Sequence, residues 1–358
     1  MINIENEKNI STIIGISAFH HIYDLEKFLD NCYNSLDKGS LMITLDDIGH
    51  SKFDKLLKNI ELRFNGKFAP TTFKKIKKFQ GIQQFIINDS FTNFEDRTTN
   101  TKERENNKLY FILASLYDDL MDENLVSQSV LNEMFLHPEK ANPNSFSETV
   151  LIDTHLKLLS RVYNKEAYQR VLNNIHQAQI DSLEQLKNDI SLERILSITE
   201  RKGGYSLLMC RHYIEMATNE NIDNCWYQLG GMIQMTNDLF DIYKDTMAGI
   251  YTFANTQNEF EKIKDQYVSQ VHKYNQSIEQ LEYDDSKKLK FQIKLSLIPA
   301  LGYVALENLK QLQGKADNLK PFKNYARKDL IVDMEKIKNI IKLIKFSYQI
   351  AKNKTINI

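Results

Sequence analysis

The sequence predicts an all-α protein, a single-domain bundle of helices. Only 5 of the 358 residues are Pro and only 12 are Gly, whereas average usage is roughly 5% and 7%. Residues that break helices are therefore too rare to separate many strands or to form a flexible linker between domains. No segment alternates convincingly between apolar and polar residues with period two. Because 42% of the residues are hydrophobic, the chain can bury a substantial core.

The N-terminal part, residues 1–107, predicts short helices followed by a loop. Apolar residues recur at helical spacing within 18–34, and polar breaks interrupt the pattern up to residue 90. The stretch 89–107 is the most polar and least periodic part of the chain. We expect it to be a loop.

The central segment, 108–255, and the C-terminal segment, 256–358, predict longer helices. An apolar run begins at residue 108 and ends in acidic residues, and Pro138 and Pro143 mark a connection. Gly203 and Gly204 interrupt the later helical pattern, which we interpret as a helix break. The further predicted helices are 148–163, 166–187, 189–201, 205–217, 225–247, 256–283, 288–312 and 331–352.

Charge and cysteine content narrow the class of protein. The chain has 46 Lys and Arg against 47 Asp and Glu, a balance that argues against a nucleic-acid-binding protein. Its three cysteines form neither a disulfide framework nor a CxxC pair, which indicates a reducing, cytoplasmic compartment. We find no signal-peptide pattern and no apolar run of about 18 residues, so no transmembrane segment is expected.

The first candidate site is a DDxxD motif formed by Asp118, Asp119 and Asp122. On a helix Asp118 and Asp122 share one face, with Asp119 on the flank. Like charges four residues apart repel each other, so this arrangement does not stabilise the helix. A bound cation would remove the repulsion, although a single motif of this kind is more often a solvated surface.

The second candidate site is the stripe of Asn237, Asp241 and Asp245, spaced four residues apart at the end of another apolar helix. Two oxygen-rich stripes could face each other across the mouth of a bundle. Oxygen ligands without accompanying His or Cys favour a hard cation, above all Mg²⁺. The occurrence of two such stripes in one all-α chain favours a metal site over two solvated faces.

These residues resemble the motifs of the class I isoprenoid synthases, over residues 108–255. The stretches that carry the resemblance are DDLMDE and QMTNDLFDIYKD. Gln234 and Asn237, followed by Asp241, Asp245 and Gly249, are similar to a segment of phytoene and squalene synthases. The same block can be read as the second aspartate-rich motif of prenyl diphosphate synthases. Read as the terpene cyclase motif, it has Asp in place of both Ser and Glu.

The resemblance implies an isoprenoid-synthase fold with a central cavity and a Mg²⁺-dependent reaction. Three Mg²⁺ ions would bind a prenyl diphosphate and promote its ionisation, and apolar and aromatic walls would shield the carbocation. The implied metal ligands are Asp118, Asp119, Asp122, Asn237, Asp241 and Asp245. The candidates for diphosphate binding are Lys202, Arg211 and Lys244. The candidates for the substrate pocket are Phe111, Ala114, Tyr117, Trp226, Gly230 and Gln234; for the aromatic residues among them, plain core packing is the alternative.

Departures from the family patterns guide the choice of reaction. Prenyl diphosphate synthases usually carry two arginines after the first motif, but here no basic residue follows Asp122 until His137 and Lys140. The segment 206–220 does not match squalene and phytoene synthases. We therefore expect a terpene synthase, a lyase that cyclises or quenches the cation of one linear prenyl diphosphate. The alternatives are a condensing prenyltransferase and a catalytically silent helical scaffold. The superfamily resemblance is also compatible with a homodimer.

Overall fold

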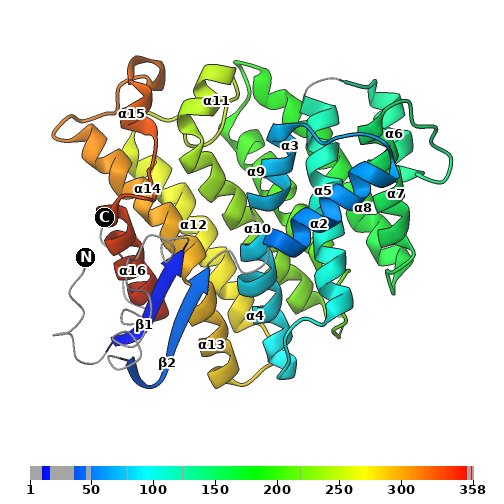
Figure 1. The fold of residues 1–358 in the computed structure, drawn as a ribbon. Helices are drawn as coiled ribbons and strands as arrows, with labels where there is room; N and C mark the ends of the chain where they lie inside the picture. The colour runs from blue at the N-terminus through cyan, green and yellow to red at the C-terminus, as the bar shows by residue number, and fades with distance from the viewer. Residues whose placement is uncertain are drawn as a thin grey trace.

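The computed structural model describes residues 10–16, 36–45, 50–78, 80–122, 125–217, 219–352 and 356. For the two strands, residues 50–52, Lys78 and Asp122, it describes the backbone only. From residue 50 onward the described chain is built from helices, which confirms the all-α prediction for this part (Figure 1). The helix predicted over 18–34 lies outside the described residues.

Two short strands precede the helices and were not predicted. Strands β1 (Ile10–Ile16) and β2 (Leu36–Leu45) pair in parallel, with Ile13 opposite Met42 and Ile16 opposite Leu45. The segment ISTIIGI is rich in β-branched residues, which favour strands. The expectation of helical segments throughout 1–90 is therefore wrong at these two places.

The helices that follow the strands run as follows. The N-terminal group is α2 (His50–Arg63), α3 (Pro70–Lys78), the π-helix η3 (Ile82–Asn88), α4 (Asp89–Thr92) and η4 (Asn93–Glu95). The central group is α5 (Thr101–Asp122), α6 (Gln128–Leu136), α7 (Phe146–Leu159), α8 (Lys165–Ser182), η5 (Leu183–Leu186), α9 (Leu192–Arg211), α10 (Glu220–Phe240) and α11 (Ile242–Ala248). The C-terminal group is α12 (Phe260–Glu279), α13 (Asp285–Leu295), α14 (Leu297–Gln313), η6 (Phe322–Asn324), α15 (Arg327–Leu330) and α16 (Ile337–Ala351).

Side-chain caps determine where several of these helices begin. The side chain of the N-cap residue accepts a hydrogen bond from a free backbone N–H of the first turn. This occurs in α6, α7, α8, α9, α10 and α13, whose caps are Ser127, Ser145, Asn164, Ser191, Asn219 and Asp284.

The polar stretch 89–107 is largely helical, contrary to the loop predicted from its composition. The N–H of Glu103 donates to Asn100 Oδ1 at 2.9 Å, and the N–H of Asn100 donates to Glu103 Oε2 at 2.7 Å. This reciprocal capping box starts α5 at Thr101. Before it, Phe91 and Phe94 are buried and fix α4 and η4 against the core.

Helix α10 lies at the centre of the core, where it packs against α9, α12 and α14. Its apolar residues Trp226, Leu229 and Met232 are completely buried. Both ends of α10 therefore have fixed positions relative to the surrounding helices, including the C-terminal end that carries the second acidic motif.

Gly203 and Gly204 do not break a helix, which corrects the sequence-based interpretation. α9 runs continuously through both residues. A Cβ atom built on Gly203 would lie 2.3 Å from the carbonyl oxygen of Gly230, and a Cβ on Gly230 would lie 2.3 Å from that of Gly203. Because real Cβ atoms do not approach so closely, this glycine pair is what allows α9 and α10 to cross in backbone contact.

Within the described residues, no single helix is long and apolar enough to span a membrane. The pair α13 and α14, bent by 43° at their junction, meets the criterion of length and composition when taken together.

Candidate active site

The first acidic motif lies in the last turn of α5, next to α3. Leu113, Leu116 and Leu120 bury the inner face of this helix, and Asp118 and Asp119 project from it partly exposed. Asp122 belongs to the same turn by its backbone. Its side chain lies outside the described residues.

Helix α3 supplies a cation and a hydroxyl group to this motif. The Lys75 Nζ atom lies 3.0 Å from Asp119 Oδ1 and 3.5 Å from Asp118 Oδ2, and the Thr72 hydroxyl donates to Asp119. Sequence reasoning missed both residues. The only signal was the lysine-rich stretch TTFKKIKK, which resembles an ordinary solvated helix face.

The second motif spans the junction between α10 and α11. Asp241 occupies the junction, and its N–H donates to the Asn237 carbonyl at 2.8 Å. The N–H of Asp245 donates to the Asp241 carbonyl at the same distance. The predicted spacing of Asn237, Asp241 and Asp245 is therefore retained through the junction.

Asp238, which was not among the predicted site residues, is the most deeply buried acid of this motif, with 5% of its surface exposed. Its carboxylate accepts hydrogen bonds from Gln234 Nε2 at 3.0 Å and from Thr199 Oγ1 at 3.3 Å. Gln234 and Asp238 are one helical turn apart, and this spacing was the signal available in the sequence.

Buried carboxylates with raised pKa values mark the second motif. Burial raises the pKa of Asp238 to about 6, an effect opposed by its two hydrogen bonds and by Lys202. Burial, together with the charges of Asp238 and Asp241, raises the pKa of Asp245 to about 7, although Lys244 and Lys202 oppose this rise. An added cation would stabilise these carboxylates in their charged form.

A cavity of about 120 Å³ lies beside the first motif and extends to Gln234, which is one turn before Asp238 on α10. Its polar side is formed by Asp118, Gln179, Lys202 and Gln234. Gln179 Nε2 donates to Asp118 Oδ1 at 3.1 Å, so Gln179 and Gln234 each bind a carboxylate of one motif. The remaining lining residues are Tyr110, Leu113, Ala114, Tyr117, Phe135, Ile175, Ser206 and Met209.

Tyr117 is held in the cavity wall by a buried hydrogen-bond chain. Its hydroxyl lies 2.6 Å from His176 Nδ1, and His176 Nε2 lies 2.6 Å from Asn132 Oδ1. Because Asn132 Oδ1 can only accept, Nε2 carries the proton and Nδ1 accepts from Tyr117. Burial lowers the pKa of His176, which favours this neutral form. The chain fixes the ring of Tyr117 beside Asp118.

Some of the residues predicted from the sequence meet in this cavity. They are Asp118, Lys202, Ala114, Tyr117 and Gln234.

Other predicted pocket residues lie elsewhere. Trp226 is completely buried, and its ring stacks on that of Phe91 with centroids 3.9 Å apart. Gly230 forms the crossing of α9 and α10. Phe111 packs against the core and is not part of the cavity lining. The structure places these three residues in packing contacts outside the cavity.

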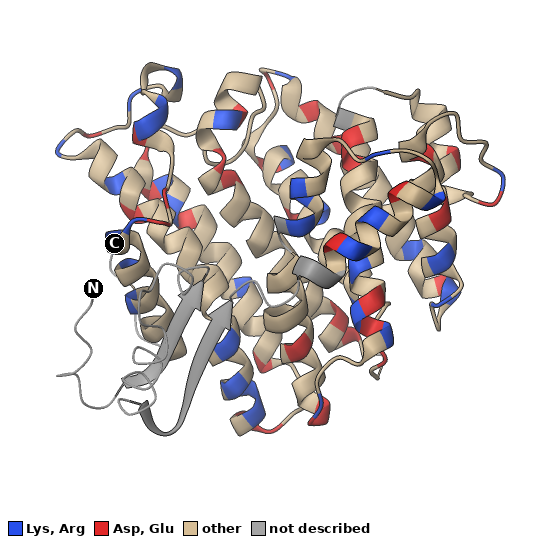
Figure 2. Cartoon of the chain, viewed as in Figure 1, with Lys and Arg blue, Asp and Glu red and all other residues tan. Residues whose placement is uncertain are grey.

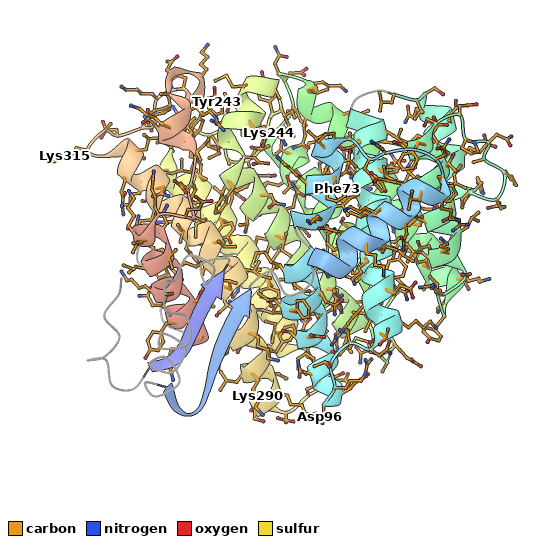
Figure 3. The ribbon with its side chains drawn as sticks, in the orientation of Figure 1. Phe73, Asp96, Tyr243, Lys244, Lys290 and Lys315 are labelled. Carbon is orange, nitrogen blue, oxygen red and sulfur yellow. The ribbon has the colours of Figure 1, made fainter. Side chains whose placement is uncertain are left out.

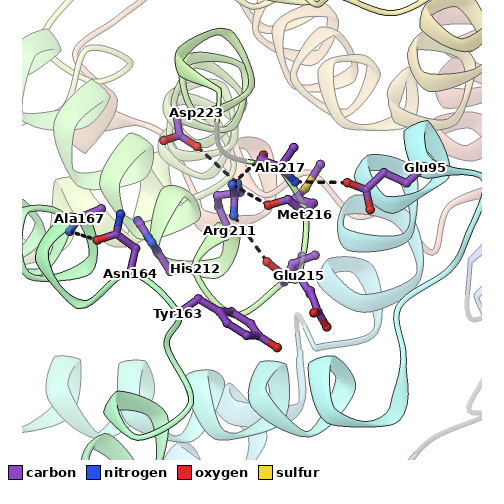
Figure 4. Close-up of a pocket in the computed structure, with 11 residues that line it drawn as sticks. Glu95, Tyr163, Asn164, Ala167, Arg211, His212, Glu215, Met216, Ala217 and Asp223 are labelled. Carbon is purple, nitrogen blue, oxygen red and sulfur yellow. Dashed lines mark hydrogen bonds and ion pairs between the residues drawn. The ribbon is translucent and has the colours of Figure 1, made fainter.

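Two of the predicted diphosphate-binding residues also lie away from the cavity. The side chain of Lys244 on α11 is 75% exposed, with Nζ 3.7 Å from Asp241 Oδ2 (Figure 3). Arg211 is nine residues beyond Lys202 on α9, which is about 13 Å along the helix axis. It lines a separate cavity of about 350 Å³ (Figure 4).

The Arg211 guanidinium holds the connection that follows α9. It donates to the carbonyl groups of Met216 and Ala217 at 3.2 and 2.9 Å, and it lies 3.4 Å from Asp223 Oδ1. With its charge paired and its donors directed at backbone oxygens, this arginine is a structural residue. Lys202 is therefore the predicted diphosphate-binding residue that faces the cavity.

The side-chain oxygens of the two motifs are suitable ligands for a hard cation. Carboxylate and amide oxygens are ligands typical of Mg²⁺. The ammonium group of Lys75 already occupies a position between Asp118 and Asp119 that suits a cation. Among the described side chains, no three His, Cys, Asp or Glu residues lie close enough together to hold a metal ion.

Comparison with known proteins gives a weak structural likeness. No protein-family model and no curated protein matches the sequence. The structure is similar to the crystal structure of a geranyltransferase from Legionella pneumophila, with a TM-score of 0.41 and 16% identity. The likeness covers 72% of this chain and 97% of that one. At this degree of likeness, the function has to be argued from the site itself.

Proposed function

We propose that the protein is an enzyme that ionises an allylic prenyl diphosphate and transfers the prenyl group to a second substrate. The observation that carries the proposal is the cavity that lies beside the first acidic motif and reaches Gln234. One side presents the Asp118 carboxylate, the amides of Gln179 and Gln234 and the Lys202 ammonium, and the other side is apolar and aromatic. This combination suits a ligand with an anionic head and a hydrocarbon chain.

The polar side of the cavity would bind the diphosphate. Asp118, Asp119, Asn237, Asp241 and Asp245 would hold Mg²⁺, which when bound neutralises the leaving diphosphate as a Lewis acid. Lys202 would pair with diphosphate oxygens. Gln179 and Gln234 orient the carboxylates of Asp118 and Asp238 through the hydrogen bonds that they donate.

The apolar side of the cavity would protect the carbocation. Leu113, Ala114 and Phe135 exclude water, and the ring of Tyr117 offers a cation–π contact of about 0.5–2 kcal/mol. A cavity of about 120 Å³ is smaller than the roughly 300–1,000 Å³ typical of ligand pockets. We therefore expect it to widen when a prenyl chain binds.

Helix α3 favours transfer to a second substrate over a reaction with one substrate. The sequence argued against transfer because no basic residue follows Asp122 until His137. Lys75, however, reaches the same motif from α3. When a metal binds to the carboxylates, Lys75 becomes available to a second anionic substrate. A terpene synthase acting on a single prenyl diphosphate is the second candidate, favoured by the absence of an arginine pair after Asp122.

Product analysis tests the proposal and separates the candidates. Purified protein with Mg²⁺ is given geranyl or farnesyl diphosphate, each with and without isopentenyl diphosphate, and products are identified by mass spectrometry. We expect a longer prenyl diphosphate only when both substrates are present. A hydrocarbon or alcohol from the allylic substrate alone would establish the terpene synthase instead.

Two variants provide the controls. Asp118→Asn should abolish product formation, and Asp265→Asn, at an exposed acid on α12, should leave it unchanged. If no substrate combination gives a product and if Mg²⁺ with pyrophosphate does not raise the melting temperature, the protein is a helical scaffold rather than an enzyme.

A further inference from the structure

The C-terminal part of the chain differs sharply in charge from the remainder. Residues 310–352 contain eleven Lys and Arg against four Asp and Glu, whereas the whole chain has a formal charge of −1. Figure 2 shows basic segments along α16 and around α15. Within this region, the span 336–352 contains five lysines and no acid.

Helix α16 has two different faces. Asn339, Leu343, Phe346 and Ser347 are buried where the helix packs against α14 and α13, and the helix also contacts β1. On the other side, Ile337 and Ile341 are 59% and 49% exposed, and the half-buried Ile344 continues the same stripe one turn later. The helix thus presents branched apolar side chains to solvent, although its buried face already meets the core.

A row of lysines borders this apolar stripe. Lys338, Lys345 and Lys352 are exposed and follow each other at intervals of seven residues. At 100° per residue they lie along one edge of the isoleucine stripe. Apolar residues beside a row of cations are the pattern of helices that lie in a membrane interface.

We propose that the exposed face of α16 binds the surface of an anionic lipid bilayer. The isoleucines would enter the boundary between headgroups and acyl chains, and the lysines would contact the anionic headgroups. Charge complementarity favours this occupant over a second copy of the chain. A two-fold contact through this face would place lysine rows of the same charge close together. The inference is independent of the proposed function.

Vesicle co-sedimentation tests the inference without substrate or metal. The full-length protein is mixed with pure phosphatidylcholine vesicles or with vesicles of equal parts phosphatidylglycerol and phosphatidylcholine. We expect binding to the anionic vesicles only, and weaker binding in 500 mM than in 100 mM NaCl because salt screens the attraction. Equal binding to both kinds of vesicle, or no binding to either, would overturn the proposal.

Matched variants locate the surface. Each lysine near an anionic membrane strengthens binding about fivefold, so the triple variant K338Q/K345Q/K352Q should bind roughly 100-fold more weakly. The double variant I337S/I341S should also bind more weakly. The control K58Q/K140Q/K165Q removes the same charge at exposed positions outside α16 and should bind within about twofold of the wild type.

Two further measurements complete the test. Circular dichroism and melting curves establish that each variant is folded, which is expected because the substituted side chains are exposed. Light scattering after size exclusion gives the molar mass in solution. A dimer that I337S/I341S converts to a monomer would show that this face binds a second copy, and it would refute the membrane proposal.

Discussion

Lys75 gives the sharpest prediction about the candidate active site. Its ammonium group lies 3.0 Å from one carboxylate of the first motif and 3.5 Å from the other, so a metal ion must displace it. Replacement by Met removes the charge and keeps a side chain of similar length. We therefore expect Lys75→Met to bind Mg²⁺ more tightly than the wild type.

The exposure of the side chains determines the size of the effect. Lys75 is 39% exposed, and Asp118 and Asp119 are 35% and 20% exposed, so solvent screens both ion pairs. Pairs of this kind contribute about 0.2–1 kcal/mol each. Together they amount to about 0.4–2 kcal/mol, which corresponds to roughly a 2–30-fold decrease in the dissociation constant of the metal.

Isothermal titration calorimetry with Mg²⁺ in the presence of pyrophosphate measures this constant. Lys77→Met is the matched control, because Lys77 lies on the same helix and pairs with Asp54 at 2.8 Å, away from the motif. Its metal affinity should equal that of the wild type. If Lys75→Met binds the metal no more tightly than Lys77→Met, the ammonium group does not compete with a metal and the reasoning is wrong.

Three further predictions concern stability. The pKa of Asp245 is raised to about 7 from an ordinary 3.8, so the folded state holds this proton more tightly than the unfolded state does. The metal-free protein should therefore lose stability as the pH rises from about 4 to 7, and Asp245→Asn should remove part of that loss when urea unfolding is compared at pH 5 and 8. Gly203→Ala should destabilise the fold by about 1–3 kcal/mol, because the added methyl group would overlap Gly230. Gly81→Ala is the control: Gly81 has a helical backbone with open space around it, so this variant should be neutral or stabilising in the same assay. Trp226→Ala should reduce the unfolding free energy by about 3–5 kcal/mol, and a change below 1 kcal/mol would contradict its placement in the core.

The sequence predicted most of the helices because their signals are local. Apolar periodicity places the helices predicted over 148–163, 166–187 and 256–283 to within about five residues, and Pro138 and Pro143 mark the connection between α6 and α7. The predictions 189–201 and 205–217 are one helix, α9, whereas 225–247 and 288–312 are each divided into two helices. The loop predicted over 89–107 was wrong because it rested on the polarity of the stretch and not on the hydrogen bonds that its side chains can form. The reciprocal bonds of Asn100 and Glu103 start a helix inside a stretch whose polarity indicated a loop.

The site was only partly predictable for a related reason. Tyr117 and Asp118 are adjacent in the sequence, and helical spacing places Gln234 one turn before Asp238. Each of these two arrangements lies within a single helix and can be predicted from that helix alone. Lys75 is 43 residues from Asp118 in the sequence, and only the packing of α3 on α5 brings the two together. Packing also separates Trp226 from the cavity, because spacing alone does not determine which neighbour a buried ring meets.

The backbone contact between Gly203 and Gly230 has a consequence for motion during turnover. Gly203 follows Lys202 directly, and Gly230 precedes Gln234 by one turn, so the contact sets the separation of these two side chains. Helices that touch through their backbones have no intervening side chains that could rearrange and let them slide. We therefore expect α9 and α10 to move as one rigid unit, and the cavity to open through displacement of α5, α6 and α8, which supply the rest of its lining.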